Sequence, residues 1–140
     1  MKPSIALLLF IAFILSNCSN DDITNLTNSN EIIVNDDLYS NAPNDNYQII
    51  QANIVDNSLN VKIEYGGGCG TVNYDLLTPV DYEDTDPVQK NIRLAFHDDD
   101  NCEALIELEL FFDIAPIQIS GNDRIIINLD RWGNQIEYIY

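Results

Sequence analysis

Apolar and polar residues alternate with a period of two along most of the chain after residue 46. The longest run covers residues 103–112, where Glu107 and Glu109 stand between apolar neighbours. Glutamate, alanine and leucine are good helix formers, but a polar face that repeats every two residues predicts a strand. This run is therefore predicted to be a strand with one face against a core and the other in solvent.

The same alternation recurs in shorter runs that are separated by turn-forming residues. These runs cover 61–65, 72–76, 92–97, 125–129 and 136–140, together with a first run that begins at Tyr47. With the run at 103–112 they make about seven strands, each expected to bury one face only. This pattern predicts an all-β fold, a small antiparallel β-sandwich or barrel.

The first 17 residues have the pattern of an export signal. Lys2 precedes an uninterrupted apolar run from Ile5 to Leu15, and small and polar residues follow it. Eleven residues rise only about 16 Å as a helix, whereas the bilayer core is about 30 Å thick. The run is therefore predicted to be a cleaved signal peptide and not a membrane span.

The signal ends at a cysteine, which changes what it predicts. Residues 15–18 read Leu-Ser-Asn-Cys and resemble the bacterial lipobox. The resemblance implies that Cys18 becomes the acylated first residue of the mature protein and anchors it to a membrane. The alternative is an ordinary secretory signal with a chance cysteine, since Asn17 is not the usual small residue at that position.

Residues 18–46 are polar and irregular, and they are predicted to be the acylated N-terminus and a flexible linker. The exception is the β-prone stretch 31–34, which can add an edge strand. Turn-forming residues at 41–46 mark the boundary of a β-sandwich domain at 47–140. Residues 18–22 also resemble the surface-export signal of Bacteroidota lipoproteins, with a solvated spacer as the alternative.

The charge balance is strongly acidic. The chain has 6 Lys and Arg against 23 Asp and Glu, for a formal net charge of −17. Removal of residues 1–17 takes away Lys2 and no acid, so the mature charge is −17 − 1 = −18. Such a chain repels phosphate backbones, so nucleic acid is not an expected partner. It also repels anionic lipid headgroups.

Cys69 and Cys102 are expected to form a disulfide, because an exported protein folds where disulfides persist. The bond closes a loop of 33 residues in sequence, which corresponds to about 3.8 kcal/mol in a chain-entropy model. The glycines at 66–70 are expected to let the backbone turn beside this disulfide. The alternative is a metal site, but two thiols and one histidine need a further ligand for closed zinc coordination.

His97 is the only histidine and is followed by three aspartates at 98–100. Beside carboxylates it can serve as an acid, a base or a metal ligand. The alternative, which we favour, is a half-exposed residue at a strand end, because no nucleophile is identifiable beside it. Trp132 lies in the last turn, either as an exposed recognition aromatic or as a lid on the core, and partial exposure is favoured.

The acidic turn after His97 also contains oxygen ligands that suit calcium. The candidate ligands are Asp98, Asp100 and Glu103. Calcium loops space their ligands and include a glycine at the sharp turn, whereas the aspartates here are contiguous and their side chains diverge. A solvated turn is the favoured alternative, and no cofactor is expected.

A family resemblance spans about residues 47–120. It rests on five short segments: Gly68–Gly70, Tyr74–Leu76, Leu94–His97, Asp100–Ala104 and Phe112–Pro116. They resemble a group of small Bacteroidota lipoproteins that includes NigD-like proteins. The resemblance implies a β-sandwich without an established activity. Val72 stands where relatives often carry a second histidine, so a shared two-histidine site is not expected.

These observations lead us to expect a non-catalytic lipoprotein with a partner-binding, accessory or protective role in the cell envelope. The lipid on Cys18 is expected to hold it at the outer membrane, facing the periplasm or the cell surface. Its expected partner is an envelope protein or a glycan. The alternatives are a calcium-dependent or carbohydrate-binding module, or a hydrolase that uses His97 and nearby acids.

Overall fold

The computed structural model describes residues 26–99 and 101–140. Eight strands and two short helices make up the regular structure of this part of the chain. They are β1 (Ile33–Val34), α1 (Asp36–Asn41), β2 (Gln48–Val55), β3 (Ser58–Gly67), β4 (Val72–Thr78), β5 (Gln89–Asp98), β6 (Ala104–Asp113), the 3₁₀ helix η1 (Ala115–Ile117), β7 (Arg124–Leu129) and β8 (Ile136–Ile139). The export signal and Cys18 lie outside the described residues.

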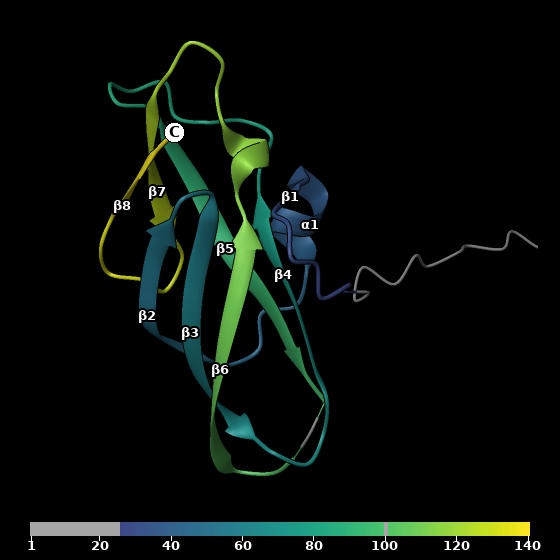
Figure 1. Ribbon diagram of the computed structural model, residues 1–140. Coiled ribbons are helices and arrows are strands. Elements are labelled where there is room, and N and C mark those ends of the chain that lie inside the picture. Colours follow the sequence, from purple (N-terminus) through teal and green to yellow (C-terminus); the bar gives the residue numbers. More distant parts are fainter. Residues whose placement is uncertain (1–25, 100) are drawn as a thin grey trace, which may run out of the picture.

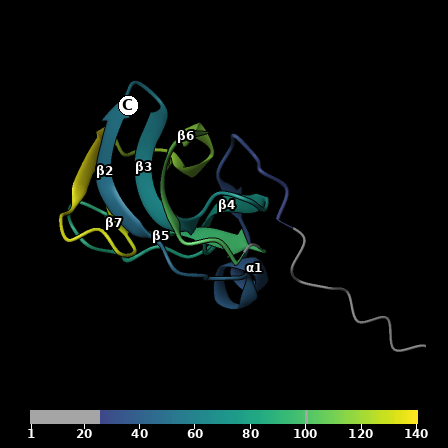
Figure 2. The same cartoon turned by 90° about the horizontal axis from the view of Figure 1, so that it is seen from below.

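The strands form two sheets that face each other, which confirms the predicted all-β sandwich. One sheet has the order β1-β4-β5-β7-β8 and the other has the order β2-β3-β6 (Figure 1). Viewed along the strands, the sheets form two layers, and α1 lies on the outer side of the β4–β5 layer (Figure 2). The seven strands expected from Tyr47 onward are β2 to β8, and β1 confirms the edge strand suggested at 31–34.

Two strand pairs of the sandwich are parallel and so depart from the predicted antiparallel arrangement. β1 pairs with β4 in parallel, and β5 pairs with β7 in parallel, with Asn91 opposite Asn128. After β5 the chain crosses to the three-stranded sheet as β6 and returns beside β5 as β7 in the same direction. Alternation reports which face a residue occupies but not the strand direction, so the sequence pattern could not reveal this crossover.

The main core fills the space between the sheets. Its buried residues come mainly from alternate positions of β3, β5 and β7: Leu59, Val61, Ile63, Ile92, Leu94, Phe96, Ile125, Ile127 and Leu129. The rings of Tyr47 and Tyr65 pack edge-on against Phe96, with centroids 5.4 and 5.1 Å away. Such ring pairs contribute beyond the area they bury, and they fix the strand ends nearest the disulfide.

A second cluster buries the opposite face of β4 and β5, so the prediction of one-sided burial fails there. Leu77 and Ala95 pack against Leu26 and Ala42, with Leu38 at the margin. Residues 26–46 therefore belong to the folded domain, and the predicted linker up to residue 46 is wrong for this part. Its few apolar residues have no regular period, which is why the sequence pattern did not identify them as packed.

Asp75, on β4, attaches the first described residues to this outer face. Its side chain is 2% exposed and accepts hydrogen bonds from the backbone N–H groups of Thr27 and Ser29, at 2.7 and 2.8 Å, and from the Thr27 hydroxyl. A buried carboxylate is tolerated only with such partners. The segment before β1 is thereby held against the sheet.

Two buried cations on β5 hold other irregular segments. Lys90 Nζ donates to the carbonyl oxygens of Pro79, Val80 and Asp81 at 2.6–2.9 Å, which closes the long loop between β4 and β5. Arg93 donates to carbonyl oxygens in and after α1, those of Leu38, Tyr39, Ala42 and Pro43. Burial lowers the pKa of both side chains, and the carbonyl dipoles compensate for the lost hydration.

The predicted disulfide between Cys69 and Cys102 is present, with the two Cα atoms 5.9 Å apart. It joins the turn after β3 to the loop before β6. Gly68 has a φ of +116°, and a Cβ there would lie 3.3 Å from the Ala104 Cβ. Glycine is therefore required beside the disulfide, both for backbone conformation and for space. In the described residues no helix is long and apolar enough to cross a bilayer.

We predict that Asp75→Ala destabilises the domain by about 1–3 kcal/mol, because two backbone N–H groups lose their acceptor. Urea unfolding of the purified protein measures the change. Asn73→Ala is the matched control, since Asn73 lies two residues earlier on the same face of β4. Limited proteolysis before residue 35 is expected to accelerate in Asp75→Ala only. Equal midpoints for the two variants would contradict the role assigned to Asp75.

Replacing both Cys69 and Cys102 with alanine is predicted to lower the free energy of unfolding by about 3.8 kcal/mol, because the unfolded chain regains loop entropy. Urea midpoints of the double variant and of the oxidised protein give the difference. The reduced wild-type protein should match the double variant. A reduced protein as stable as the oxidised one would contradict a stabilising disulfide.

Candidate functional site

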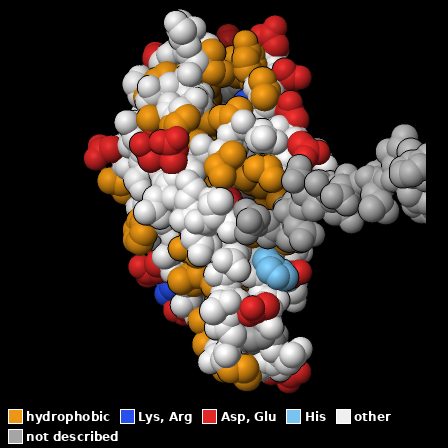
Figure 3. All heavy atoms as spheres, turned by 90° about the vertical axis from the view of Figure 1, so that its right-hand side faces the viewer, with side chains coloured by type: hydrophobic (Ala, Val, Ile, Leu, Met, Phe, Trp, Pro, Cys, Tyr) orange, Lys and Arg blue, Asp and Glu red, His pale blue; other side chains and the backbone are white. Residues whose placement is uncertain are grey.

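His97 lies near the end of β5 on the outer face of the five-stranded sheet, with its side chain 39% exposed. Figure 3 shows its imidazole at the molecular surface. Its Nδ1 lies 2.8 Å from Asp45 Oδ2. Because an ionised carboxylate can only accept, this nitrogen carries the proton in that pair. The half-exposed histidine near a strand end is confirmed, but its partner is Asp45 and not the following aspartates.

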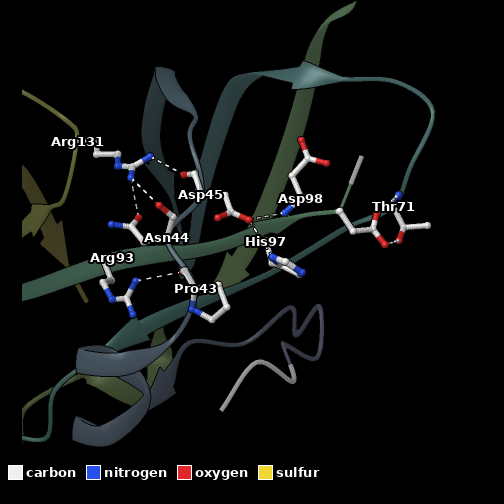
Figure 4. Close-up of polar contacts among 9 residues, drawn as sticks. Pro43, Asn44, Asp45, Thr71, Arg93, His97, Asp98 and Arg131 are labelled. Atoms are coloured by element: carbon white, nitrogen blue, oxygen red, sulfur yellow. Dashed lines mark hydrogen bonds and ion pairs between the residues drawn. The ribbon is translucent and has the colours of Figure 1, made fainter. Parts of the chain in front are cut away.

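Asp45 connects the segment before β2 to the end of β5 (Figure 4). Its Oδ2 also accepts from the backbone N–H of Asp98 at 2.9 Å. This backbone bond is the main reason that the pKa of Asp45 lies below its ordinary value of 3.8, and His97 lowers it further. The sequence pattern does not single out Asp45, because this residue lies in a stretch of turn-forming residues. No local signal connects residues 45 and 97.

Arg131, in the turn after β7, also holds the segment before β2 in place. It has a φ of +60° and donates to the carbonyl oxygens of Asn44, Asp45 and Tyr47 at 3.0–3.2 Å. Its guanidinium lies 4.2 Å from the Tyr47 ring centroid. Burial raises the pKa of Tyr47 to about 12, and its hydroxyl donates to the Leu94 carbonyl. The polar network around His97 thus holds backbone in place.

Only two of the three candidate calcium ligands lie within the described residues. Asp98 ends β5 and Glu103 precedes β6, while Asp100 lies outside the described part of the chain. The Asp99 carboxylate accepts from the backbone N–H and the hydroxyl of Thr71. Across residues 26–99 and 101–140, no group of three or more His, Cys, Asp or Glu side chains is placed to hold a metal ion.

A cleft of about 590 Å³ lies elsewhere on the surface, between α1 and the turn that joins β7 to β8. Asn91 and Asn128 form part of its lining, and they face each other because β5 and β7 pair in parallel with these two residues in register. Tyr39 lines the α1 side and Trp132 lines the turn side. This cleft is the candidate binding site of the domain.

Three carboxamide side chains of the lining are linked with that of Gln89, which is not itself a lining residue, into one network that we call the amide ladder: Gln89, Asn91, Asn128 and Gln135. Asn128 Nδ2 donates to Asn91 Oδ1 at 3.2 Å and to Gln89 Oε1 at 3.1 Å. Gln135 Nε2 donates to Asn128 Oδ1 at 3.0 Å and to Gln89 Oε1 at 3.2 Å. Each amide orients the next, so the polar atoms that face the cleft are held in position.

The aromatic side chains that line the cleft are also positioned by their surroundings. The Arg93 guanidinium lies 5.8 Å from the Tyr39 ring centroid. Burial raises the pKa of Tyr39, the Asp130 carboxylate raises it further, and Arg93 opposes both. Trp132 is partly buried and packs against the main core, which confirms the partial exposure expected for it. Of the residues at this site, Trp132 alone was identified from sequence.

Comparison with known proteins indicates the fold but not the function. No family model and no curated protein matches the chain. The structure is similar to a solved structure from Bacteroides vulgatus described as a protein of unknown function, DUF1344, with a TM-score of 0.52 and 17% sequence identity. The similarity covers 78% of this chain and 53% of that one, so the chain spans about half of its length. At this identity the likeness supports the β-sandwich fold alone.

We predict that the Asp45→Asn variant loses part of the acid sensitivity of the domain. A carboxylate whose folded-state pKa is depressed contributes stability above its ordinary pKa, and that contribution is lost as the pH falls through the folded value. Wild-type urea midpoints should therefore fall more steeply below about pH 4 than those of Asp45→Asn. Asp84→Asn, in the exposed β4–β5 loop, serves as the control. Equal falls in the urea midpoint at acidic pH for the wild type and Asp45→Asn would contradict the role assigned to Asp45.

Proposed function

We propose that this protein is a lipid-anchored lipoprotein of the cell envelope that binds a ligand without transforming it. The observation that carries the binding role is the cleft between α1 and the β7–β8 turn. Its lining combines ordered amides with two aromatic side chains. These groups recognise ligands by hydrogen bonds and apolar contact and supply neither a nucleophile nor a paired acid and base.

The arrangement around His97 supports a non-catalytic role over the hydrolase alternative. In a hydrolase with a nucleophilic side chain, the histidine hydrogen-bonds the hydroxyl or thiol that it activates, and the described residues contain no such bond from His97. Nδ1 of His97 is directed at Asp45, and the same Asp45 oxygen accepts a backbone N–H of β5. The pair thus anchors the segment before β2.

The envelope location is supported by the sequence of the N-terminus and by the chemistry of the domain. The lipobox-like residues 15–18 imply export and acylation at Cys18. The disulfide between Cys69 and Cys102 suits an oxidising compartment. The resemblance to NigD-like lipoproteins points in the same direction, towards the outer membrane.

The anchor is tested by Cys18→Ser in the producing cell. The wild-type protein is expected to sediment with membranes and to carry acyl chains on a mature N-terminus at Cys18, whereas Cys18→Ser should lose both the acyl mass and the membrane partition. Mass spectrometry of the intact protein and fractionation measure the two outcomes. Cys69→Ser serves as the control and should retain the lipid. An unmodified wild-type N-terminus would exclude the anchor.

A further inference from the structure

We propose that the cleft binds a neutral oligosaccharide. This inference rests on the proposed role as a ligand-binding lipoprotein and adds the chemical class of the ligand. It is carried by three features of the cleft: the amide ladder, the two aromatic side chains and the sign of the local charge.

The amide ladder leaves both donors and acceptors available in the cleft. Within the described residues, Gln135 Oε1 and the carboxamide of Asn134 have no hydrogen-bond partner, and Asn91 uses one amide N–H, on Glu83 Oε1. Sugar hydroxyls donate and accept at once, so a lining that offers both kinds of group in a fixed geometry suits them. A ligand rich in a single kind of group would leave part of this lining unpaired.

The aromatic side chains add an apolar component. Tyr39 and Trp132 both line the cleft, and such rings can pack against the C–H faces of a pyranose. The described structure contains no hydrogen bond from the Trp132 indole N–H, and this atom is not a buried unpaired group. It is therefore open to solvent and available to a ligand hydroxyl.

The charges at the cleft favour a neutral sugar over an acidic one. The Asp130 carboxylate belongs to the lining, and the whole chain carries a formal net charge of −17, which repels uronates and phosphorylated sugars. Arg93 also lines the cleft, but its guanidinium N–H groups are directed at backbone carbonyls around α1. Arg93 therefore has few N–H groups left to donate to an anionic ligand.

An organic cation is a less suitable occupant, although two aromatic rings and a carboxylate can attract one. The Arg93 guanidinium already lies near the Tyr39 ring, so its positive charge repels a second cation at that ring. A quaternary ammonium group also has no donor or acceptor that could hydrogen-bond to the amide ladder. The volume of about 590 Å³ falls in the range of roughly 300–1,000 Å³ typical of small-molecule sites, which suits a short stretch of oligosaccharide.

The test is isothermal titration of the full chain, purified in detergent micelles, with defined probes. The neutral probes are tetrasaccharides of glucose, galactose, mannose and N-acetylglucosamine, and the comparison probes are a galacturonate tetrasaccharide and choline. We expect at least one neutral tetrasaccharide to bind. Its affinity should fall about tenfold in Asn128→Ala, which removes the centre of the ladder.

Asn134→Ala provides a second variant, because this exposed side chain has no described intramolecular hydrogen bond to lose and its removal should not affect folding. It is expected to weaken binding while the urea midpoint stays unchanged. Asn73→Ala lies on the same sheet outside the cleft and should bind as the wild type does.

Failure of every neutral tetrasaccharide to bind would overturn the inference. So would binding of only galacturonate or choline, or an affinity that the Asn128→Ala and Asn134→Ala variants leave intact. These outcomes do not affect the acyl mass at Cys18 or the membrane partition, so the ligand class and the proposed anchoring fail separately.

Discussion

Three charged side chains buried in adjacent strands hold together the parts of this domain that have no regular pairing. Asp75 on β4 and Lys90 and Arg93 on β5 are at most 8% exposed, and each is satisfied mainly by backbone groups of a segment outside the two sheets. A buried charge without partners is very costly, so the loops and the strands depend on each other. If one of these segments leaves, a charged side chain loses its hydrogen-bond partners and the apolar face beside it is exposed.

Positive charge is scarce in this chain, and its distribution reflects that constraint. In the part of the chain that the structure describes, Lys90, Arg93 and Arg131 are committed to backbone carbonyls. Lys62 and Arg124 pair with glutamates. The acidic excess is therefore left largely uncompensated at the surface, which favours uncharged ligands over anionic ones.

The sequence pattern predicted the strands well because alternation directly reports a half-buried strand. It failed for β5, because burial of one face only would place Arg93, between Ile92 and Leu94, in solvent. Residues 26–42 cover Arg93, and a contact between segments some 50 residues apart produces no local pattern in the sequence. The cleft could not be predicted for the same reason. Asn91 and Asn128 lie opposite each other only because β5 and β7 pair in parallel, and periodicity does not reveal which strands pair.

The position of Leu26 sets how far the domain can stand from a membrane. Leu26 is 8% exposed and packs against the sheet, so the chain is fixed to the domain at this residue. Under the proposed acylation, the span from Cys18 to Leu26 reaches at most about 28 Å when fully extended. Had the fold begun at residue 47, the limit would be about 100 Å. With that anchor, this short span would confine the domain to a thin layer above the headgroups, and the cleft would meet its ligand close to the lipid surface.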